Sequence, residues 1–167
     1  MSSEKHHFEI LKAVPQDAAV LTKISFAAKC HWRYPREYMD IWKDELTITS
    51  GYITENQVFI AVWDHKPAGF YSITENRTDR YSGEIFVEKG HWLEHIFILP
   101  EFHKIGIGSS LISHAVSHCR AAGIGSLKIF SDPYAAGFYE KLGARFLYDS
   151  KSSIPGREIP VYELKFG

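Results

Sequence analysis

The feature that most constrains the fold is a strand that leads through a proline into a glycine-containing loop and a helix. From Trp92 to Leu99 apolar residues occur on both parities, which predicts a central strand covered on both faces. Pro100 follows, then Gly106 and Gly108. From Gly106 to about Ala122 apolar residues recur at helical spacing and predict an amphipathic helix. We therefore expect a chain of mixed α and β structure in which this strand leads to a helix start.

The start of that helix is a candidate anion site. The first N–H groups of an α-helix lack acceptors within the helix and lie at the positive end of its dipole. Gly106 and Gly108 have no Cβ, so a pyrophosphate can approach the main chain, and Lys104 adds a positive charge. This sequence is not the GxGxxG motif of dinucleotide-binding proteins, because Leu111 occupies the position of the third glycine. It is not a Walker loop either, because no Gly-Lys-Ser/Thr follows.

The rest of the chain predicts short strands and helices separated by turn residues. Asp132 and Pro133 have the positions of an N-cap and a first-turn proline, and Gly143 marks the end of that helix. A β-hairpin is predicted around residues 64–67, and a polar loop over residues 76–83. The predicted strands cover residues 8–13, 57–63, 68–74, 84–87, 127–130, 145–148 and 161–166, and further helices follow Pro15 and Pro35 and cover 134–142.

The size and charge of the chain narrow its class. We expect one domain over residues 1–167, because 167 residues with 45% hydrophobic content suffice for one ordinary core. The formal charge of −1 predicts neither a nucleic-acid partner nor an anionic membrane partner. Neither a leader nor a membrane span is recognised, and the separated cysteines Cys30 and Cys119 suit a reducing compartment, so we expect a cytoplasmic protein, with a homodimer left open.

An aromatic segment broken by a proline runs from residue 31 to residue 42. It contains Trp32, Tyr34 and Trp42. Two interpretations stay open: the rings pack into the core as a helix–helix connection, or Trp32 and Tyr34 form a wall that binds the substrate. Ring faces would suit a partly apolar or cationic small molecule.

Two further segments together resemble one family. Residues 98–108, Ile-Leu-Pro-Glu-Phe-His-Lys-Ile-Gly-Ile-Gly, are similar to the acetyl-CoA motif of the GCN5-related N-acetyltransferase (GNAT) superfamily, with His103 where glutamine or arginine is usual. Residues 132–144, Asp-Pro-Tyr-Ala-Ala-Gly-Phe-Tyr-Glu-Lys-Leu-Gly-Ala, resemble a later motif of that family, with Asp132 where asparagine is usual. The resemblance extends from Gln57 to Tyr148.

This resemblance implies a fold and a cofactor. The implied fold is α/β (α+β), with a mixed, mostly antiparallel sheet of about seven strands, about four flanking helices, and a splay between the family's fourth and fifth strands. Pantetheine lies in that splay as an added strand, and the N–H of Ile98 would polarise the thioester carbonyl. The residues implied to bind acetyl-CoA are Phe97, Ile98, Leu99, His103, Lys104, Ile105, Gly106, Ile107, Gly108, Ser109, Asp132, Ala135, Phe138 and Tyr139.

Glu94 is the candidate general base and a contact of the acceptor amine. An alkyl amine with a pKa of about 10.4 is almost wholly protonated at neutral pH, so a base must help to remove its proton. A carboxylate on a strand with two apolar faces is expected to be desolvated, which raises its pKa. The spelling Leu-Glu-His-Ile-Phe-Ile-Leu-Pro over residues 93–100 also resembles diamine and aminoglycoside acetyltransferases. The alternative is a strand-end glutamate in solvent or paired with a neighbour.

Tyr139 is the candidate general acid, and the reaction is predicted to be a direct attack. The leaving thiol has a pKa of about 8.5, and Tyr139 matches the family's proton donor. Phe138 and Tyr139 are alternatively two core aromatics. Neither cysteine has a nucleophile setting near the cofactor motif.

The sequence therefore predicts an acetyl-CoA-dependent N-acetyltransferase that acts on a primary amine of a small molecule or peptide. The alternative is a non-catalytic acyl-CoA-binding or regulatory module. No metal site is predicted, because His114 and His118 have no third ligand with them.

Overall fold

The computed structural model describes residues 4–166. Short 3₁₀ turns, η1 (Pro15–Asp17), η2 (Pro100–Phe102) and η3 (Pro133–Ala135), precede α1, α4 and α5. In chain order, the other elements are β1 (Phe8–Lys12), α1 (Ala18–Cys30), α2 (Arg36–Leu46), α3 (Ser50–Glu55), β2 (Gln57–Trp63), β3 (Lys66–Asn76), β4 (Arg80–Ser82), β5 (Ile85–Val87), β6 (Gly90–Ile98), α4 (Ile107–Ala121), β7 (Ser126–Phe130), α5 (Ala136–Lys141), β8 (Arg145–Lys151) and β9 (Glu158–Lys165).

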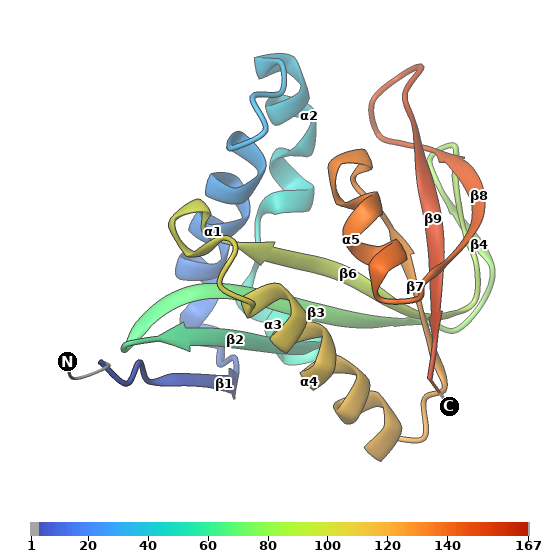
Figure 1. The fold of residues 1–167 in the computed structure, drawn as a ribbon. Coiled ribbons are helices and arrows are strands. Elements are labelled where there is room, and N and C mark those ends of the chain that lie inside the picture. Colours follow the sequence, from blue (N-terminus) through green and yellow to red (C-terminus); the bar gives the residue numbers. More distant parts are fainter. Residues whose placement is uncertain (1–3, 167) are drawn as a thin grey trace. The chain divides into compact units, whose positions relative to one another are not determined.

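The main sheet has seven strands in the order β1-β2-β3-β6-β7-β9-β8 (Figure 1). The pairs β1–β2, β7–β9 and β8–β9 are antiparallel, whereas β6 and β7 are parallel. The parallel register is Trp92↔Lys128, near the start of β6. The structure thus confirms the predicted mixed sheet, and it confirms that the apolar strand from Trp92 onward is an interior strand.

The predicted polar loop over residues 76–83 is wrong, because it contains a strand. β4 pairs with β5 in a separate antiparallel two-stranded sheet, with Arg80 opposite Val87. The Asn76 side-chain amide donates to the carbonyls of Val87 and Glu88, and its Oδ1 accepts from Arg80 Nε. Side-chain bonds from one asparagine therefore support a short hairpin whose first strand is fully exposed.

Helix α3 was not predicted from the sequence. It has only six residues and includes Gly51, which lowers its helix propensity. Its start is fixed by Thr49, whose hydroxyl accepts from the Tyr52 N–H at 3.0 Å. Ile53, which is 4% exposed, anchors it in the core.

The chain groups into two compact units, which are described separately. One unit runs up to Ser72 and includes His95–Ala115; the other comprises Ile73–Glu94 and the chain from Val116 onward. Strands β3 and β6 and helix α4 each run from one unit into the other. The single-domain expectation stays a prediction.

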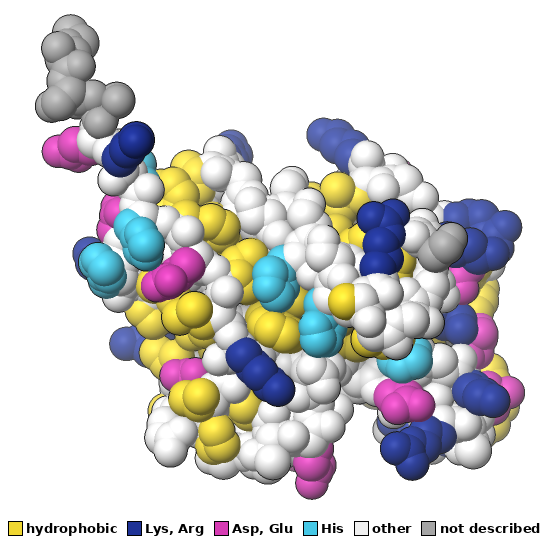
Figure 2. Space-filling view, turned by 90° about the horizontal axis from the view of Figure 1, so that it is seen from below, with side chains coloured by type: hydrophobic (Ala, Val, Ile, Leu, Met, Phe, Trp, Pro, Cys, Tyr) yellow, Lys and Arg dark blue, Asp and Glu magenta, His cyan; other side chains and the backbone are white. Residues whose placement is uncertain are grey.

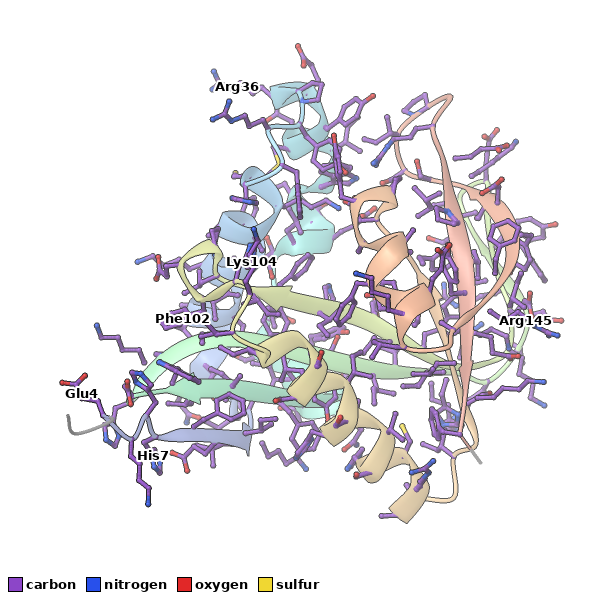
Figure 3. All side chains as sticks on the ribbon, viewed as in Figure 1. Glu4, His7, Arg36, Phe102, Lys104 and Arg145 are labelled. Carbon is purple, nitrogen blue, oxygen red and sulfur yellow. The ribbon has the colours of Figure 1, made fainter. Side chains whose placement is uncertain are left out.

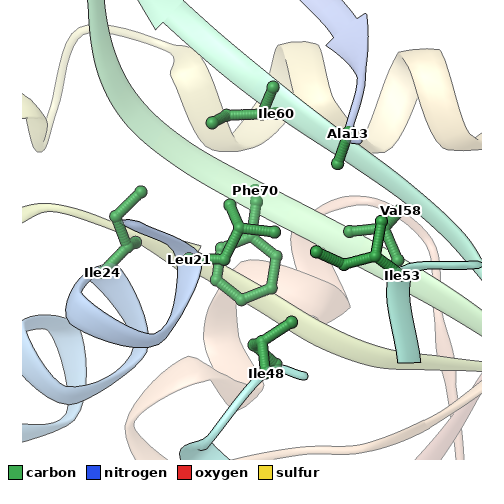
Figure 4. Packing of buried hydrophobic residues seen from close by; sticks show 8 residues of the cluster. All are labelled: Ala13, Leu21, Ile24, Ile48, Ile53, Val58, Ile60 and Phe70. Carbon is green, nitrogen blue, oxygen red and sulfur yellow. The ribbon is translucent and has the colours of Figure 1, made fainter. Parts of the chain in front are cut away.

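The core of the first unit lies between α1, α3 and one face of the sheet. Leu21 and Ile24 on α1 and Phe70 on β3 are at most 2% exposed. Figure 4 shows the eight residues of this cluster: Ala13, Leu21, Ile24, Ile48, Ile53, Val58, Ile60 and Phe70. Burying a side chain such as Phe70 is worth about 1.5–3 kcal/mol.

The opposite face of the same strands meets α4. The rings of Phe59 and Tyr71 stack at 5.3 Å, and the His114 ring lies 4.8 Å from Phe59. Tyr71 Oη and His114 Nδ1 are 2.7 Å apart. Because strand side chains alternate between faces, Phe70 and Ser72 share the α1 side while Tyr71 faces α4.

The core of the second unit is aromatic. Trp92 stacks on Phe130 with ring centroids 4.5 Å apart, and the Tyr139 ring lies 6.3 Å from that of Tyr162. Tyr162 donates to Glu140 Oε1 at 2.7 Å, which ties β9 to α5.

The surface carries charges of both signs. On the face shown in Figure 2, acidic and basic side chains are interspersed. Among residues 4–166, no helix combines the length and the apolar composition needed to cross a membrane.

Candidate functional site

The loop between β6 and α4 forms an open cradle in front of a helix start. Figure 3 shows Phe102 and Lys104 on this loop. Lys104 and Gly106 have φ angles of 63° and 89°, in the left-handed region that favours glycine. A Cβ built on Gly106 would meet no atom within 4 Å. α4 begins at Ile107, and its first main-chain N–H groups have no acceptor within the helix. This arrangement suits a phosphate group.

His103 joins this loop to the end of β6. Its Nε2 lies 3.2 Å from the carbonyl oxygen of Ile98, and because a carbonyl only accepts, Nε2 carries the proton. The His31 ring, just after α1, meets the His103 ring edge-on at 5.0 Å. His103 therefore links the loop to the main chain at the end of β6.

The main-chain hydrogen-bonding groups at the end of β6 point alternately to the two edges of the strand. The Leu99 N–H donates to Ala68 on β3 at 2.8 Å, and the Leu99 carbonyl accepts from Phe102 at 2.9 Å. Both main-chain groups of Leu99 are thus engaged within the protein. Because N–H directions alternate along an extended strand, the N–H of Ile98 points to the edge opposite β3. Of these residues, Ile98 is therefore better placed than Leu99 to donate to a ligand at that edge.

β3 approaches this part of β6 very closely. A Cβ on the buried Gly69 would lie 2.6 Å from the Phe97 carbonyl oxygen and 3.2 Å from the Ile98 Cα, both backbone atoms. Only a glycine fits at this position of β3. This close contact could not be predicted from the sequence, because an isolated glycine in a strand has several explanations.

Glu94 is exposed, so the expectation that burial desolvates it is wrong. Its neighbours Leu93 and His95 are 3% and 8% exposed. A strand turns successive side chains to opposite faces, and apolar neighbours therefore do not imply a buried carboxylate. Its proposed role now depends on its position in the chain and on the resemblance.

His95 lies in a buried polar network on the other face of β6. Its Nδ1 is 2.7 Å from Ser72 Oγ and 3.2 Å from Tyr52 Oη, and these two hydroxyls are 2.9 Å apart. Its Nε2 lies 3.1 Å from the Glu45 carbonyl, which fixes the proton on Nε2. The network joins β6, β3, α3 and α2. Ser72 and Tyr52 were not identified from the sequence, because no local pattern pairs them with His95.

In the second unit, Tyr139 is a buried phenol within the second motif, residues 132–144. It is 4% exposed, and both burial and the charge of Asp132 raise its pKa far above the ordinary value. Tyr139 is protonated at neutral pH, as an ordinary tyrosine also is. The motif neighbours Ala135 and Phe138 are half-buried.

Asp132 acts as an N-cap, as its alternative interpretation predicted. Its Oδ1 accepts from the Tyr134 N–H at 3.0 Å at the start of η3.

Within the aromatic segment, one ring packs in the core and the others are more exposed, so neither interpretation applies to all of its residues. Trp42 is 4% exposed and packs in the core, whereas Trp32 is 41% exposed and Tyr34 is half-buried. Tyr34 and Trp42 meet at 4.9 Å and 84°.

Of the two histidines on α4, His114 packs against the aromatic rings of the sheet. His114 contacts Tyr71 and Phe59, and within the described residues no group of three or more His, Cys, Asp or Glu side chains could hold a metal ion.

Comparison with known proteins places these features in a family. A sequence model of the acetyltransferase (GNAT) family matches residues 23–144, which include β6, the cradle and α5. A protein of Bacillus subtilis named as an acetyltransferase is 40% identical over 53 residues, 32% of this chain. The match spans 36% of that relative's own length.

Solved structures of the same fold cover nearly the whole chain. A GCN5-related N-acetyltransferase from Rhodopseudomonas palustris has a TM-score of 0.74 and 19% identity over 99% of both chains. The PaiA N-acetyltransferase of Thermoplasma acidophilum, solved with coenzyme A, has a TM-score of 0.71 and 17% identity over 96% of this chain and 99% of that one. A GNAT-family acetyltransferase of Brucella melitensis, solved with acetyl-CoA, has a TM-score of 0.62 and 21% identity over 98% and 90% of the two chains.

At these sequence identities, the structural similarity shows that the fold is the same. Membership of the family is shown by the match to the family's sequence model. Since that model matches most of the sequence, the chain belongs to the acetyltransferase (GNAT) family.

Proposed function

We propose that the protein transfers the acetyl group of acetyl-CoA to a primary amine of a small molecule or peptide by direct attack. As a member of its family it is an acetyltransferase, and acetyl-CoA is its acetyl donor. The observation that carries the proposal is the open loop before α4, whose Gly106 at φ 89° leaves space where a side chain would otherwise project.

The residues of the loop fit the phosphates of coenzyme A. The N–H groups of Ile107, Gly108 and Ser109 at the start of α4 would bind a pyrophosphate, and the exposed Lys104 would add a positive charge. His103 holds this loop against Ile98, so the phosphate end and the thioester end of the donor would be kept at a fixed separation.

The N–H of Ile98 would polarise the thioester. It points away from β3, to the edge of β6 where the family binds pantetheine. A hydrogen bond to the carbonyl oxygen becomes stronger as negative charge develops there, and loss of one such donor typically costs about 10²–10³ in kcat.

Glu94 is proposed as the base and Tyr139 as the acid. Glu94 would take one proton from the ammonium form of the acceptor, and the neutral amine that results attacks the thioester carbon and loses its second proton to solvent. The C–S bond then breaks, and Tyr139 would give its proton to the departing sulfur. The phenol of Tyr139 is protonated at neutral pH, as an ordinary tyrosine is, and its raised pKa makes it a weaker acid than a free phenol.

A cysteine nucleophile is disfavoured. Cys119 is buried, and burial raises the pKa of its thiol to about 11, so thiolate is scarce at neutral pH. Cys30 is exposed and free, and it follows Lys29 at the end of α1, outside the cofactor loop.

The test compares two conservative variants in an assay of thiol release. Glu94→Gln should lower kcat/KM by about 10²-fold at pH 7, and the loss should shrink as the pH approaches the pKa of the amine. Tyr139→Phe should lower kcat by a similar factor. Glu75→Gln on β3 and Tyr162→Phe are the matched controls and should keep kcat. Full activity in both test variants would remove these assignments.

The remaining expectations are also part of this proposal. A cytoplasmic location is supported by the two free cysteines. The homodimer and the absence of a nucleic-acid partner stay predictions, which gel filtration and a filter-binding assay would check.

A further inference from the structure

Three aromatic rings after α1 form a compact cluster, and a lysine ammonium lies over two of them. We call Tyr34, Tyr38 and Trp42 the aromatic cage. The Tyr38 and Trp42 rings lie 5.5 Å apart at 73°, and those of Tyr34 and Tyr38 lie 6.1 Å apart at 29°. Lys29 Nζ lies over the Trp42 ring at 4.3 Å from its centroid and over the Tyr34 ring at 5.5 Å. One ammonium group is therefore in contact range of two of these rings.

The local sequence explains why the rings converge. Tyr38 and Trp42 are four residues apart on α2, so they share one face of the helix. Tyr34 lies just before α2, and Pro35 sets the direction in which the chain enters it. Lys29 is in the last turn of α1. The cage is thus built from one helix and the connection that precedes it.

The cage has the properties of an ammonium site. A cation over an aromatic face gains about 0.5–1 kcal/mol when exposed and about 2 kcal/mol when water is excluded, and tryptophan is the best ring. Trp42 is 4% exposed and Lys29 is half-buried, and the face of the Trp42 ring covers one side of the Lys29 ammonium. The group that Lys29 presents is a primary alkylammonium, which is chemically the same as a protonated amine substrate.

The segment that carries the cage also contacts the cofactor loop, through His31. The His31 ring contacts the Trp32 ring at 5.0 Å and the His103 ring at 5.0 Å. All these residues belong to the first unit. A ligand in the cage would therefore lie beside the same segment that packs on the cradle.

We propose that the aromatic cage binds a primary alkylammonium, namely the second, non-reacting cationic group of the acceptor, and that Lys29 occupies the cage until the acceptor binds. The assignment of that ligand as acceptor rests on the proposed function; the cage as a cation site does not. Lys29 has a long flexible stem and can withdraw into water. The enzyme then prefers diamines to monoamines of the same length.

The kinetic test compares putrescine with n-butylamine, which lacks the second charge. Lys29→Met keeps the stem and removes the competing ammonium, so it should lower KM for putrescine by about 5- to 10-fold while leaving KM for n-butylamine unchanged. Lys43→Met removes an exposed positive charge next to Trp42 in the sequence, and it should change neither value. Equal effects of Lys29→Met on both amines would overturn the proposal.

A second variant tests the ring itself. In the Lys29→Met background, Tyr34→Leu should abolish the gain for putrescine, and Tyr34→Phe should restore it, because phenylalanine keeps the aromatic face. Trp42 is unsuitable for this test, since its burial makes a general loss of folding the expected result. If Tyr34→Leu leaves the gain intact, the ring does not bind the ligand.

A binding measurement separates this proposal from the proposed function. n-Butylammonium is titrated into the Lys29→Met variant without acetyl-CoA and followed by NMR. Ring currents should shift the ligand methylene protons upfield in Lys29→Met and less in Lys29→Met/Tyr34→Leu. An equal shift in both variants, or none in either, would overturn the cage as a cation site, even if the enzyme acetylates amines. A shift without any acetylation would contradict only the proposed function.

Discussion

At the scale of single residues, the pleat of β6 gives two adjacent polar side chains opposite environments. His95 is 8% exposed and lies within hydrogen-bond distance of Ser72, Tyr52 and Glu45, whereas Glu94 is exposed. A base that meets a solvent-borne amine suits the exposed position. His95 instead connects four elements, and its bonds hold the strand that carries Glu94 and Ile98.

Gly106 gives a prediction at this scale. Gly106→Ala should destabilise the protein by about 1 kcal/mol, because alanine disfavours the φ of 89° found there. The new methyl group would also project into open space at the cradle, so the Kd for coenzyme A should rise. Chemical denaturation and calorimetric titration measure the two effects.

The matched control for Gly106 is Gly51 on α3. Gly51 has helical geometry, and the nearest atom to an added Cβ would be Thr49 Oγ1 at 4.0 Å. Gly51→Ala should raise stability by about 0.5–1 kcal/mol and leave coenzyme A binding unchanged. If both alanine variants bind coenzyme A as the wild type does, Gly106 does not line the phosphate site.

Some site residues could be identified from sequence and others could not. Gly106, Lys104 and Asp132 are recognisable because loop, charge and cap are local properties of the chain. The exposure of Glu94 was missed because it depends on which face of the strand each residue takes. Ser72 and Gly69 were missed because their roles come from contacts with His95 and Phe97, which are distant in sequence.

At the scale of elements, the contact between β3 and β6 positions the end of β6, where acetyl-CoA is proposed to bind. Leu99 donates to Ala68, and the backbone at Gly69 lies against the Phe97 carbonyl. Small shifts of β3 would therefore move Phe97 and Ile98 directly.

Gly69→Ala should consequently damage both stability and catalysis. A Cβ would lie 2.6 Å from the Phe97 carbonyl oxygen, and a backbone atom cannot rotate away. We expect a loss of about 1–3 kcal/mol in the free energy of unfolding, and a lower kcat at temperatures where the variant is fully folded. Wild-type kcat in the folded variant would show that this strand contact does not position the reacting groups.

The bond between Tyr162 and Glu140 predicts how stability depends on alkaline pH. The hydrogen bond to Glu140, together with burial, raises the pKa of Tyr162 from 10.0 to about 12. Above the unfolded pKa the unfolded state binds fewer protons than the folded state, so the free energy of unfolding falls as pH rises from about 10 to about 12. Below pH 10 this contribution is fully present.

Tyr162→Phe isolates that contribution. The variant should lose about 1–2 kcal/mol of stability at pH 7, because it lacks the hydrogen bond to a carboxylate. Its decline between pH 10 and 12 should be shallower than that of the wild type, with the other raised tyrosines, Tyr139 and Tyr148, still contributing. Urea titrations across this pH range give the comparison, and parallel pH curves would contradict the linkage.

The helices and strands with a long apolar pattern in the sequence were predicted, and the short elements α3 and β4, which have no such pattern, were not. α1, α4 and β6 carry sustained apolar patterns, and their bounds differ from the predictions by few residues. α3 depends on one cap and one buried isoleucine, and the β4–β5 hairpin depends on Asn76. Such short elements are stabilised by a few specific bonds, which no periodicity reveals.

At the scale of the whole molecule, the order of the elements specifies the architecture. An apolar interior strand, the helix after it and the later parallel strand β7 give a mixed sheet of seven strands. The strand order of the sheet, and the position of β9 between β7 and β8, cannot be read from hydrophobic pattern, and the resemblance implied only a mixed sheet of about seven strands. Membership of the family does not identify the acceptor amine. The aromatic cage is informative because it suggests what kind of amine binds.

The most direct test of the central claim is mass spectrometry of the reaction products. The wild-type protein is incubated with acetyl-CoA and a mixture of amines that includes putrescine, n-butylamine, amino acids and peptides. Acetyl transfer predicts one acetylated amine for each coenzyme A thiol released, with no acetyl group retained on the protein and with a much smaller yield in Glu94→Gln. Binding of acetyl-CoA without any acetylated amine would contradict the account and favour a non-catalytic acyl-CoA-binding module.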